Sequence, residues 1–268
     1  MLRRIMNDVI LYGPHWSAYT RTVRMALVEK QVSYQLEEVD FLRGDMPVDQ
    51  VERHPFAKVP TLQHGDYCLY ETAAICRYID IAFPGCALQP VTPRSLGRMA
   101  QIIGVLDAYL SEPARIGFAS ELLVKPLMGF APDADLAAQA EVQIISSFKA
   151  LSDCMDSGSG EFLVGDRLSL ADLHAVPMID YIDRTPGGSS LIAKYSRLYD
   201  WWCGIRTRPS VIDTQPDLSV FEVAKWLKQG GRCTEVAATR SKQGGGSMLK
   251  VVGSSCRAEV PGRKHQGW

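Results

Sequence analysis

The chain lacks three features that would assign it to other classes of protein. Its seven cysteines include no C-x-x-C pair, and their spacing fits no zinc module. No apolar run approaches the roughly 20 residues that a membrane span requires. Charge of neither sign predominates, since the formal net charge of the 268 residues is −1. We therefore expect no bound metal, no membrane insertion and no binding of nucleic acid.

The cysteine count and the first residues indicate a compartment. The number of cysteines is odd, and Asn7 and Asp8 interrupt the apolar run that a secretory signal would need after the basic segment 1–4. We expect reduced thiols in a cytoplasmic protein. With 46% hydrophobic residues, the chain is long enough for two domains of a soluble globular protein.

The first third of the chain predicts alternating strands and helices. Residues 9–12 form a short apolar run of β-formers, which Gly13-Pro14 ends. Residues 22–30 have the pattern of a helix, and the alternation over 32–37 is typical of a half-buried strand. The order is therefore β-α-β, followed by a loop region.

A hairpin and a helix are predicted next. Gly65-Asp66 suits a two-residue turn between strands at 61–63 and 67–69. Helical spacing of apolar residues then begins near Glu71. First-turn amides lack partners within a helix and favour anions, so a carboxylate near Thr72 would be bound there, while Glu71 would pair with an ammonium group. Both residues also suit ordinary helix capping.

The second half is predicted to be helical. Prolines and a glycine at 84, 85, 90 and 93 indicate a linker, and strand signals are missing beyond it. Ser169 and Asp172 have the spacing of a capping box, which fixes the start of a helix. Two apolar stripes have the spacing of helices that face a common core: Ile102, Leu106, Tyr109 and Leu110, and Ile144, Phe148, Leu151 and Met155.

Taken in order, these segments resemble the glutathione transferase family over roughly residues 8 to 217. The resemblance is carried by 56–62, 70–75, the first helix at 22–30 and the capping-box segment 162–173. It implies an α/β N-terminal thioredoxin-like domain plus an all-α C-terminal domain. The expected boundaries are 7–84 for the glutathione-binding domain, 85–93 for the linker, 94–217 for the helical domain, and 218–268 for an extension that is largely flexible apart from a helix near 220–227.

The resemblance also assigns the glutathione site. Pro60 is cis in the family, and Val59 before it offers its backbone to the cysteinyl part of glutathione as an added strand would. Lys58 matches a position that faces the glycyl carboxylate. Glu71 and Thr72 would hold the ammonium and carboxylate groups of the γ-glutamyl end.

The segment between the first strand and the first helix is where catalysis is expected. The alignment places Ser17 where serine-type members, such as the phi, theta and zeta classes, carry their hydroxyl, and Tyr19 where thiol-type members carry cysteine. A free cysteine thiol has a pKa of roughly 8.5, so a hydroxyl donor beside the positive end of a helix would favour the reactive thiolate. Ser17 is the predicted donor. There are two alternatives. Tyr19 could be the donor, or the site has no catalytic hydroxyl and Ser17 is only a helix cap.

The resulting hypothesis is a glutathione transferase that conjugates the thiolate of its co-substrate glutathione to an electrophilic small molecule. A homodimer and a role in detoxification are implied by the resemblance. A glutathione-dependent isomerase of the zeta kind is one alternative, although zeta members have Ser-Ser-Cys where this chain has Ser17-Ala18-Tyr19. A non-enzymatic binding or assembly module is the other.

Overall fold

A four-stranded mixed sheet forms the first part of the chain in the computed structural model, which describes residues 8–42, 45–156 and 160–228. The strand order is β2-β1-β3-β4, with β1 parallel to β2 and antiparallel to β3, and β3 antiparallel to β4. The strands and helices of this first part are β1 (Val9–Tyr12), α2 (Ala18–Glu29), β2 (Gln35–Glu37), α3 (Val48–Arg53), β3 (Thr61–His64), β4 (Tyr67–Tyr70) and α4 (Thr72–Ala82).

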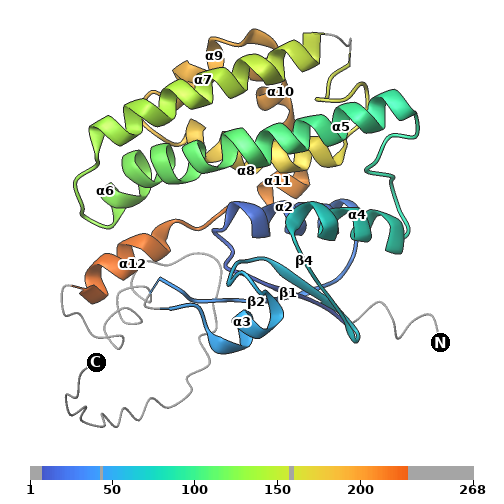
Figure 1. Ribbon diagram of the computed structural model, residues 1–268, viewed down its shortest axis with the longest axis horizontal. Coiled ribbons are helices and arrows are strands. Elements are labelled where there is room, and N and C mark those ends of the chain that lie inside the picture. Colours follow the sequence, from blue (N-terminus) through green and yellow to red (C-terminus); the bar gives the residue numbers. More distant parts are fainter. Residues whose placement is uncertain (1–7, 43–44, 157–159, 229–268) are drawn as a thin grey trace, which may run out of the picture. The chain divides into compact units, whose positions relative to one another are not determined.

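The predicted hairpin and the helix after it are confirmed. Gly65 and Asp66 form the two-residue turn between β3 and β4, and Gly65 adopts a φ of 63°, which glycine accommodates without steric cost. Helix α4 begins at Thr72, directly after β4. Helices α2 and α4 pack against each other and cover one face of the sheet, whereas α3 lies on the other side (Figure 1).

The named elements in the rest of the described chain are helices, as predicted. The elements are α5 (Pro93–Val105), η1 (Leu106–Leu110), η2 (Pro113–Val124), α6 (Lys125–Leu127), α7 (Ala134–Asp156), α8 (Leu170–Asp183), α9 (Gly188–Ala193), α10 (Ser196–Ile205), α11 (Pro209–Ile212) and α12 (Ser219–Lys228). Figure 1 shows α5, α7 and α8 on the side of α2 and α4 that faces away from the sheet. Among the described helices, none has the length and apolarity that crossing a bilayer would demand.

The capping box is confirmed and does more than start a helix. One carboxylate oxygen of buried Asp172 accepts hydrogen bonds from the backbone amide and the hydroxyl of Ser169, both at 2.8 Å. The other accepts from the amide of Leu163 and from Nε1 of Trp201, both at 2.9 Å. Asp172 thus joins the start of α8 to the preceding loop and to α10.

Three expectations about local structure are wrong. The strand predicted over 32–37 begins later, at Gln35, because Val32 donates its amide to the carbonyl of Leu27 (2.9 Å) and so closes the end of α2. The expected loop before β3 contains the short helix α3. Tyr109 is 67% exposed rather than part of the buried stripe, because the helix there has the wider i→i+5 hydrogen bonding of a π-helix.

A buried ion pair joins the two parts of the fold. The guanidinium of Arg21, 1% exposed, contacts the carboxylate of Asp180 on α8 and donates to the carbonyl of Val211 at 3.1 Å. Arg184 donates to the second oxygen of Asp180 at 3.0 Å. Because α2 also packs on α4, this pair connects the layer beside the sheet to the helical part.

Replacing Asp180 should destabilise the protein strongly. Asp180→Asn leaves the Arg21 charge buried without its carboxylate, so we expect the free energy of unfolding to fall by about 3 kcal/mol. Denaturant titration measures this change. Asp153→Asn is the matched control, because Asp153 pairs with Lys149 on the surface and the loss there should stay below about 1 kcal/mol. Equal losses would contradict the role given to the buried pair.

Candidate active site

The register of the sheet brings the predicted site segments to one edge. Tyr12 at the end of β1 lies opposite Thr61 at the start of β3, and Thr61 lies opposite Tyr70 at the end of β4. The loop after β1, the segment before β3 and the start of α4 therefore meet at the same end of the strands. Ser17, Val59-Pro60 and Glu71-Thr72 are brought together in this way.

Ser17 is the N-cap of α2. Its side-chain oxygen accepts a hydrogen bond from the amide of Thr20 at 3.3 Å, and its carbonyl accepts from the amide of Arg21 at 2.9 Å. The cap uses a lone pair of the hydroxyl, and Ser17 donates no side-chain hydrogen bond within the described part of the chain. A hydroxyl hydrogen is thus available at the positive end of a 12-residue helix.

Helix α3 anchors the segment before β3 through hydrogen bonds. Gln50, which is buried, donates its side-chain amide to the carbonyl of Lys58 at 2.8 Å and to the hydroxyl of Thr61 at 3.0 Å. The Val59-Pro60 peptide bond between these anchors is cis. Lys58 is exposed, Val59 is half-buried and Pro60 is buried. Sequence reasoning did not identify Gln50, because nothing in its spacing indicated α3.

Glu71 and Thr72 form the start of α4. Glu71 is exposed and has φ 70° and ψ 115°, a combination that non-glycine residues rarely adopt. Such a conformation costs on the order of 1–3 kcal/mol and concentrates at functional positions. The buried Thr72 is the first helical residue, so its amide has no partner within the helix.

A cleft of about 690 Å³ opens beside this edge, between the sheet part and the helical part. Of the predicted site residues, Ser17, Lys58 and Val59 line it, as does Tyr19, whereas Pro60, Glu71 and Thr72 do not. The opposite wall comes from η1, η2 and α12 and includes residues that the sequence did not indicate: Asp107, Ser111, Glu112, Arg115, Ile116, Ala119 and Phe221.

Three aromatic rings from distant segments meet in the cleft. Trp16, next to Ser17, lies 5.2 Å from the ring of Phe41 and 5.3 Å from the ring of Phe221, measured between ring centroids. The backbone carbonyl of Trp16 also accepts a hydrogen bond from the hydroxyl of Tyr181 on α8. Flat apolar walls of this kind suit a planar apolar ligand group.

The hydroxyl of Tyr19 is already engaged. It donates to the side-chain oxygen of Ser111 at 2.7 Å, and the Arg115 guanidinium lies 5.1 Å from the centroid of its ring. Burial raises the pKa of Tyr19 above its ordinary value. A hydroxyl that donates to the helical wall cannot donate the same hydrogen to a ligand thiol, so the geometry favours Ser17.

Asp107 brings a second titratable group to the same wall. Burial raises the pKa of its carboxyl, while nearby His174 acts in the opposite direction. Asp107 lies one residue after Leu106 of the predicted stripe, so an apolar pattern gave no reason to single it out. Its place in the cleft follows from packing of the helical part against α2.

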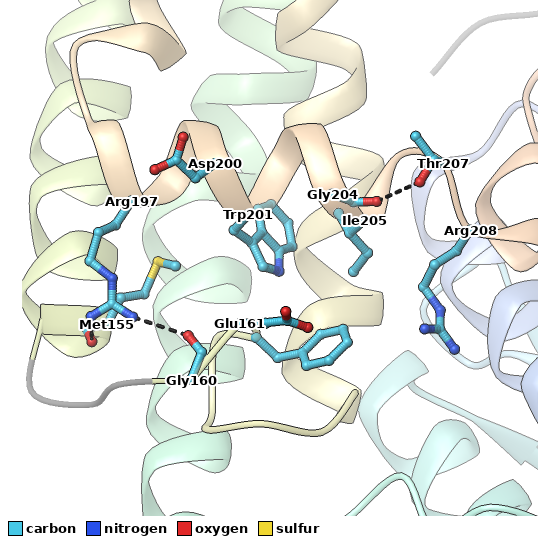
Figure 2. A pocket seen from close by; sticks show the side chains of 11 residues that line it. Met155, Gly160, Glu161, Arg197, Asp200, Trp201, Gly204, Ile205, Thr207 and Arg208 are labelled. Atoms are coloured by element: carbon cyan, nitrogen blue, oxygen red, sulfur yellow. Dashed lines mark hydrogen bonds between the residues drawn. The ribbon is translucent and has the colours of Figure 1, made fainter.

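A second hollow, of about 500 Å³, lies within the helical part between the end of α7 and α10 (Figure 2). Arg197 there donates to the carbonyls of Met155 and Gly160, the latter at 3.1 Å, and Trp201 donates to Asp172. The hydrogen bonds of Arg197 therefore join Met155 to Gly160, and that of Trp201 belongs to the capping box. None of the predicted site residues lies in this hollow.

A thioredoxin-like sheet with a cis peptide bond at one edge and a serine at a helix N-terminus beside it, followed by a helical part, is the architecture of two-domain enzymes that act on a thiol. Residues 11–87 match the model for the glutathione S-transferase N-terminal domain, and residues 93–209 match the model for the C-terminal domain. The chain belongs to the glutathione S-transferase family.

Individual proteins agree with the family match. The chain is 30% identical over 204 residues to glutathione S-transferase F10 of Arabidopsis thaliana, covering 74% of this chain and 92% of that protein. Among solved structures, glutathione S-transferase III in apo form is similar with a TM-score of 0.69 and 28% identity, over 78% of this chain and 99% of that one. Glutathione S-transferase-I bound with lactoylglutathione is similar with a TM-score of 0.68 and 25% identity, over 77% of this chain and 98% of that one.

His15 positions the loop that carries Ser17. Its Nδ1 lies 2.9 Å from Oε1 of Glu38, and its amide donates to the same carboxylate at 3.2 Å. The hydrogen bond with Glu38 raises the pKa of His15 above 6.5, although burial acts against it. Because the folded-state pKa is raised, this pair stabilises the protein below pH 6.5 and the contribution is lost as the pH rises through the folded-state value.

Glu38→Gln should therefore lower the pKa of His15 and weaken the protein at acid pH. We expect a loss below about 1 kcal/mol, since Glu38 is 47% exposed, and the loss should shrink above neutrality. NMR titration of the imidazole and denaturation at several pH values measure both effects. Glu37→Gln, one residue earlier and without contact to His15, is the control, and an unchanged His15 pKa in Glu38→Gln would refute the pairing.

Proposed function

We propose that Ser17 activates the thiol of bound glutathione for conjugation to an electrophilic small molecule. The observation that carries the proposal is the geometry of Ser17: its oxygen caps α2 while its hydrogen remains available, in the same cleft as Val59. A thiolate at that point receives a hydrogen bond and lies at the positive end of the helix. Both effects favour the ionised sulfur over the thiol.

The residues around Ser17 complete a site for the glutathione peptide. Val59 presents its backbone to the cysteinyl part as a neighbouring strand would, and Lys58 faces the glycyl carboxylate. The first-turn amide and hydroxyl of Thr72 bind the γ-glutamyl carboxylate, and Glu71 pairs with the ammonium group. The unfavourable backbone of Glu71 supports this assignment, because such conformations persist where a ligand site requires them.

The finer features that family membership implies belong to the same proposal. We infer a homodimer located in the cytoplasm and acting in detoxification. Exposed aromatic side chains near the glutathione edge, Phe56 and Tyr70, support the dimer, since such groups are enriched in interfaces between subunits. The domain boundaries at 84, 93 and 217 remain predictions, and the tail from 229 lies outside the described residues.

Ser17→Ala should separate binding from catalysis. We expect glutathione affinity to change less than about twofold, whereas kcat/KM for conjugation falls by about 10²-fold, the usual cost of one donor to a developing or full anion. Calorimetric titration and steady-state kinetics measure the two quantities.

Two further variants act as controls for Ser17→Ala. Ser17→Thr keeps both the cap and the hydroxyl and should restore most of the rate. Tyr19→Phe should leave most of the rate intact, because the Tyr19 hydroxyl is bonded to Ser111. If Tyr19→Phe abolishes conjugation while Ser17→Ala does not, the catalytic assignment passes to Tyr19.

Thr72→Ala should weaken glutathione binding. Loss of the hydroxyl removes one hydrogen bond to a charged carboxylate, worth about 1.5–3 kcal/mol, so Kd should rise roughly tenfold or more. Calorimetric titration measures it. Thr92→Ala is the matched control, because Thr92 caps α5 outside the cleft and should leave the affinity unchanged. Equal affinities in the native protein and Thr72→Ala would contradict the binding role of the α4 start.

A further inference from the structure

The ring of His15 joins the loop that carries Ser17 to two segments that are distant in the sequence. Its Nδ1 lies 2.9 Å from Oε1 of Glu38, and its Nε2 lies 3.2 Å from the backbone carbonyl oxygen of Asp217. Glu38 directly follows β2, and Asp217 lies two residues before α12. The imidazole therefore bridges the sheet part, the Ser17 loop and the segment that leads into α12.

The protonation state of the ring decides how many of these contacts are hydrogen bonds. A carboxylate and a carbonyl oxygen only accept, so both ring nitrogens must carry a hydrogen, and that is true only of the imidazolium. Neutral imidazole has one N–H group. Its hydrogen stays on Nδ1, because the bond to the charged carboxylate of Glu38 is the stronger one. Nε2 then presents a lone pair to the carbonyl oxygen of Asp217, and that hydrogen bond is lost.

The charged groups that face His15 come from three elements. The hydrogen bond with Glu38 has the largest effect and raises the pKa of the ring, burial lowers it, and Asp217 raises it further. Arg24 on α2 donates to the backbone carbonyl of His15 at 3.4 Å. Because the pKa lies above 6.5, the imidazolium persists beyond that pH and disappears as the pH rises through the folded-state value.

Helix α12 forms part of the cleft through Phe221. The buried ring of Phe221 lies 5.3 Å from the ring of Trp16, measured between centroids, and it lines the cleft. Helix α12 also packs on α6. The hydrogen bond between His15 and Asp217 is thus a polar connection that supplements these contacts at the start of the helix.

The chain upstream of Asp217 has an anchor that does not titrate near neutral pH. Nη1 of Arg24 donates to the carbonyl of Thr214 at 3.3 Å, and a guanidinium keeps its charge over the whole range in which histidine titrates. Loss of the bond to Asp217 therefore affects the chain that follows Thr214, which is α12.

We infer that His15 is a positioning residue that holds α12 against the Ser17 loop when both ring nitrogens are protonated and releases it when Nε2 loses its hydrogen. In the released state α12 keeps its contacts with Trp16 and α6 but lacks the connection at Asp217, so it opens more often. One proton thereby controls how firmly Phe221 closes the cleft. This inference goes beyond the proposed function and does not depend on chemistry at the thiol.

Hydrogen exchange on the full chain without any substrate tests the inference. We expect the protection of the amides in 219–225, corrected for the intrinsic exchange rate at each pH, to fall about fivefold between about pH 5 and pH 8. The midpoint of this fall should coincide with the titration of the His15 imidazole, which NMR measures on the same protein.

Two variants distinguish a proton-controlled contact from ordinary packing. His15→Ala should show the lower protection at every pH. Glu38→Gln lowers the pKa of His15, so the midpoint for α12 should move to lower pH together with the imidazole titration. His64→Ala is the matched control and should keep the native profile, because His64 lies on β3 and bonds with Tyr78 at 2.8 Å.

Three results would overturn the inference. They are protection in the native protein that does not depend on pH, a native pH profile in His15→Ala, and a midpoint in Glu38→Gln that stays in place while the imidazole titration moves. If His15→Ala does not fold, Glu38→Gln decides alone. Since no glutathione is present, each of these results leaves the assignment of Ser17 unaffected.

Discussion

The position of helix α2 is the constraint on which the rest of this structure depends. Its N-terminus carries Ser17, and one turn later Arg21 forms the buried pair with Asp180 of α8. The same helix packs on α4. Ser17 on one wall of the cleft and Arg115 on the other are therefore held at a fixed separation. Moving Arg21 away from Asp180 would leave a buried charge without its partner, which is strongly unfavourable.

The chemistry of the cleft follows from how two hydroxyl groups are used. Ser17 accepts from the backbone and keeps its hydrogen, while Tyr19 gives its hydrogen to Ser111. Only the first arrangement leaves a donor for a sulfur anion. Ser111 and Arg115 line the other wall of the same cleft, where the proposed function places the electrophile.

The parts of the fold that could be predicted are those fixed by local sequence. Gly65-Asp66 determines a turn by itself, and Ser169 with Asp172 caps a helix through bonds that span three residues. The start of α4 after β4 is local in the same sense. Ser17, Lys58 and Val59 were identified through the resemblance of the segments around the first helix and Pro60 to the family.

The helical wall could not be predicted, because its members come together only through packing. Arg115 and Phe221 lie more than a hundred residues apart in the chain and meet in one cleft. The π-helical hydrogen bonding of η1 and η2 rotates side chains away from the positions that a 3.6-residue period assigns, which is why Tyr109 is exposed. Helix α3, which contains Gln50, has six residues, and no period of apolar residues over this length predicts it.

The account is tested most directly by titrating the ultraviolet absorbance of the glutathione thiolate on the native protein as the pH is raised. Activation by Ser17 predicts a bound thiol whose pKa lies about two units below the free value of roughly 8.5, a stabilisation of about 2.7 kcal/mol. Glutathione that binds but titrates at its free value would contradict the central claim, because the cleft would then hold the peptide without activating its sulfur.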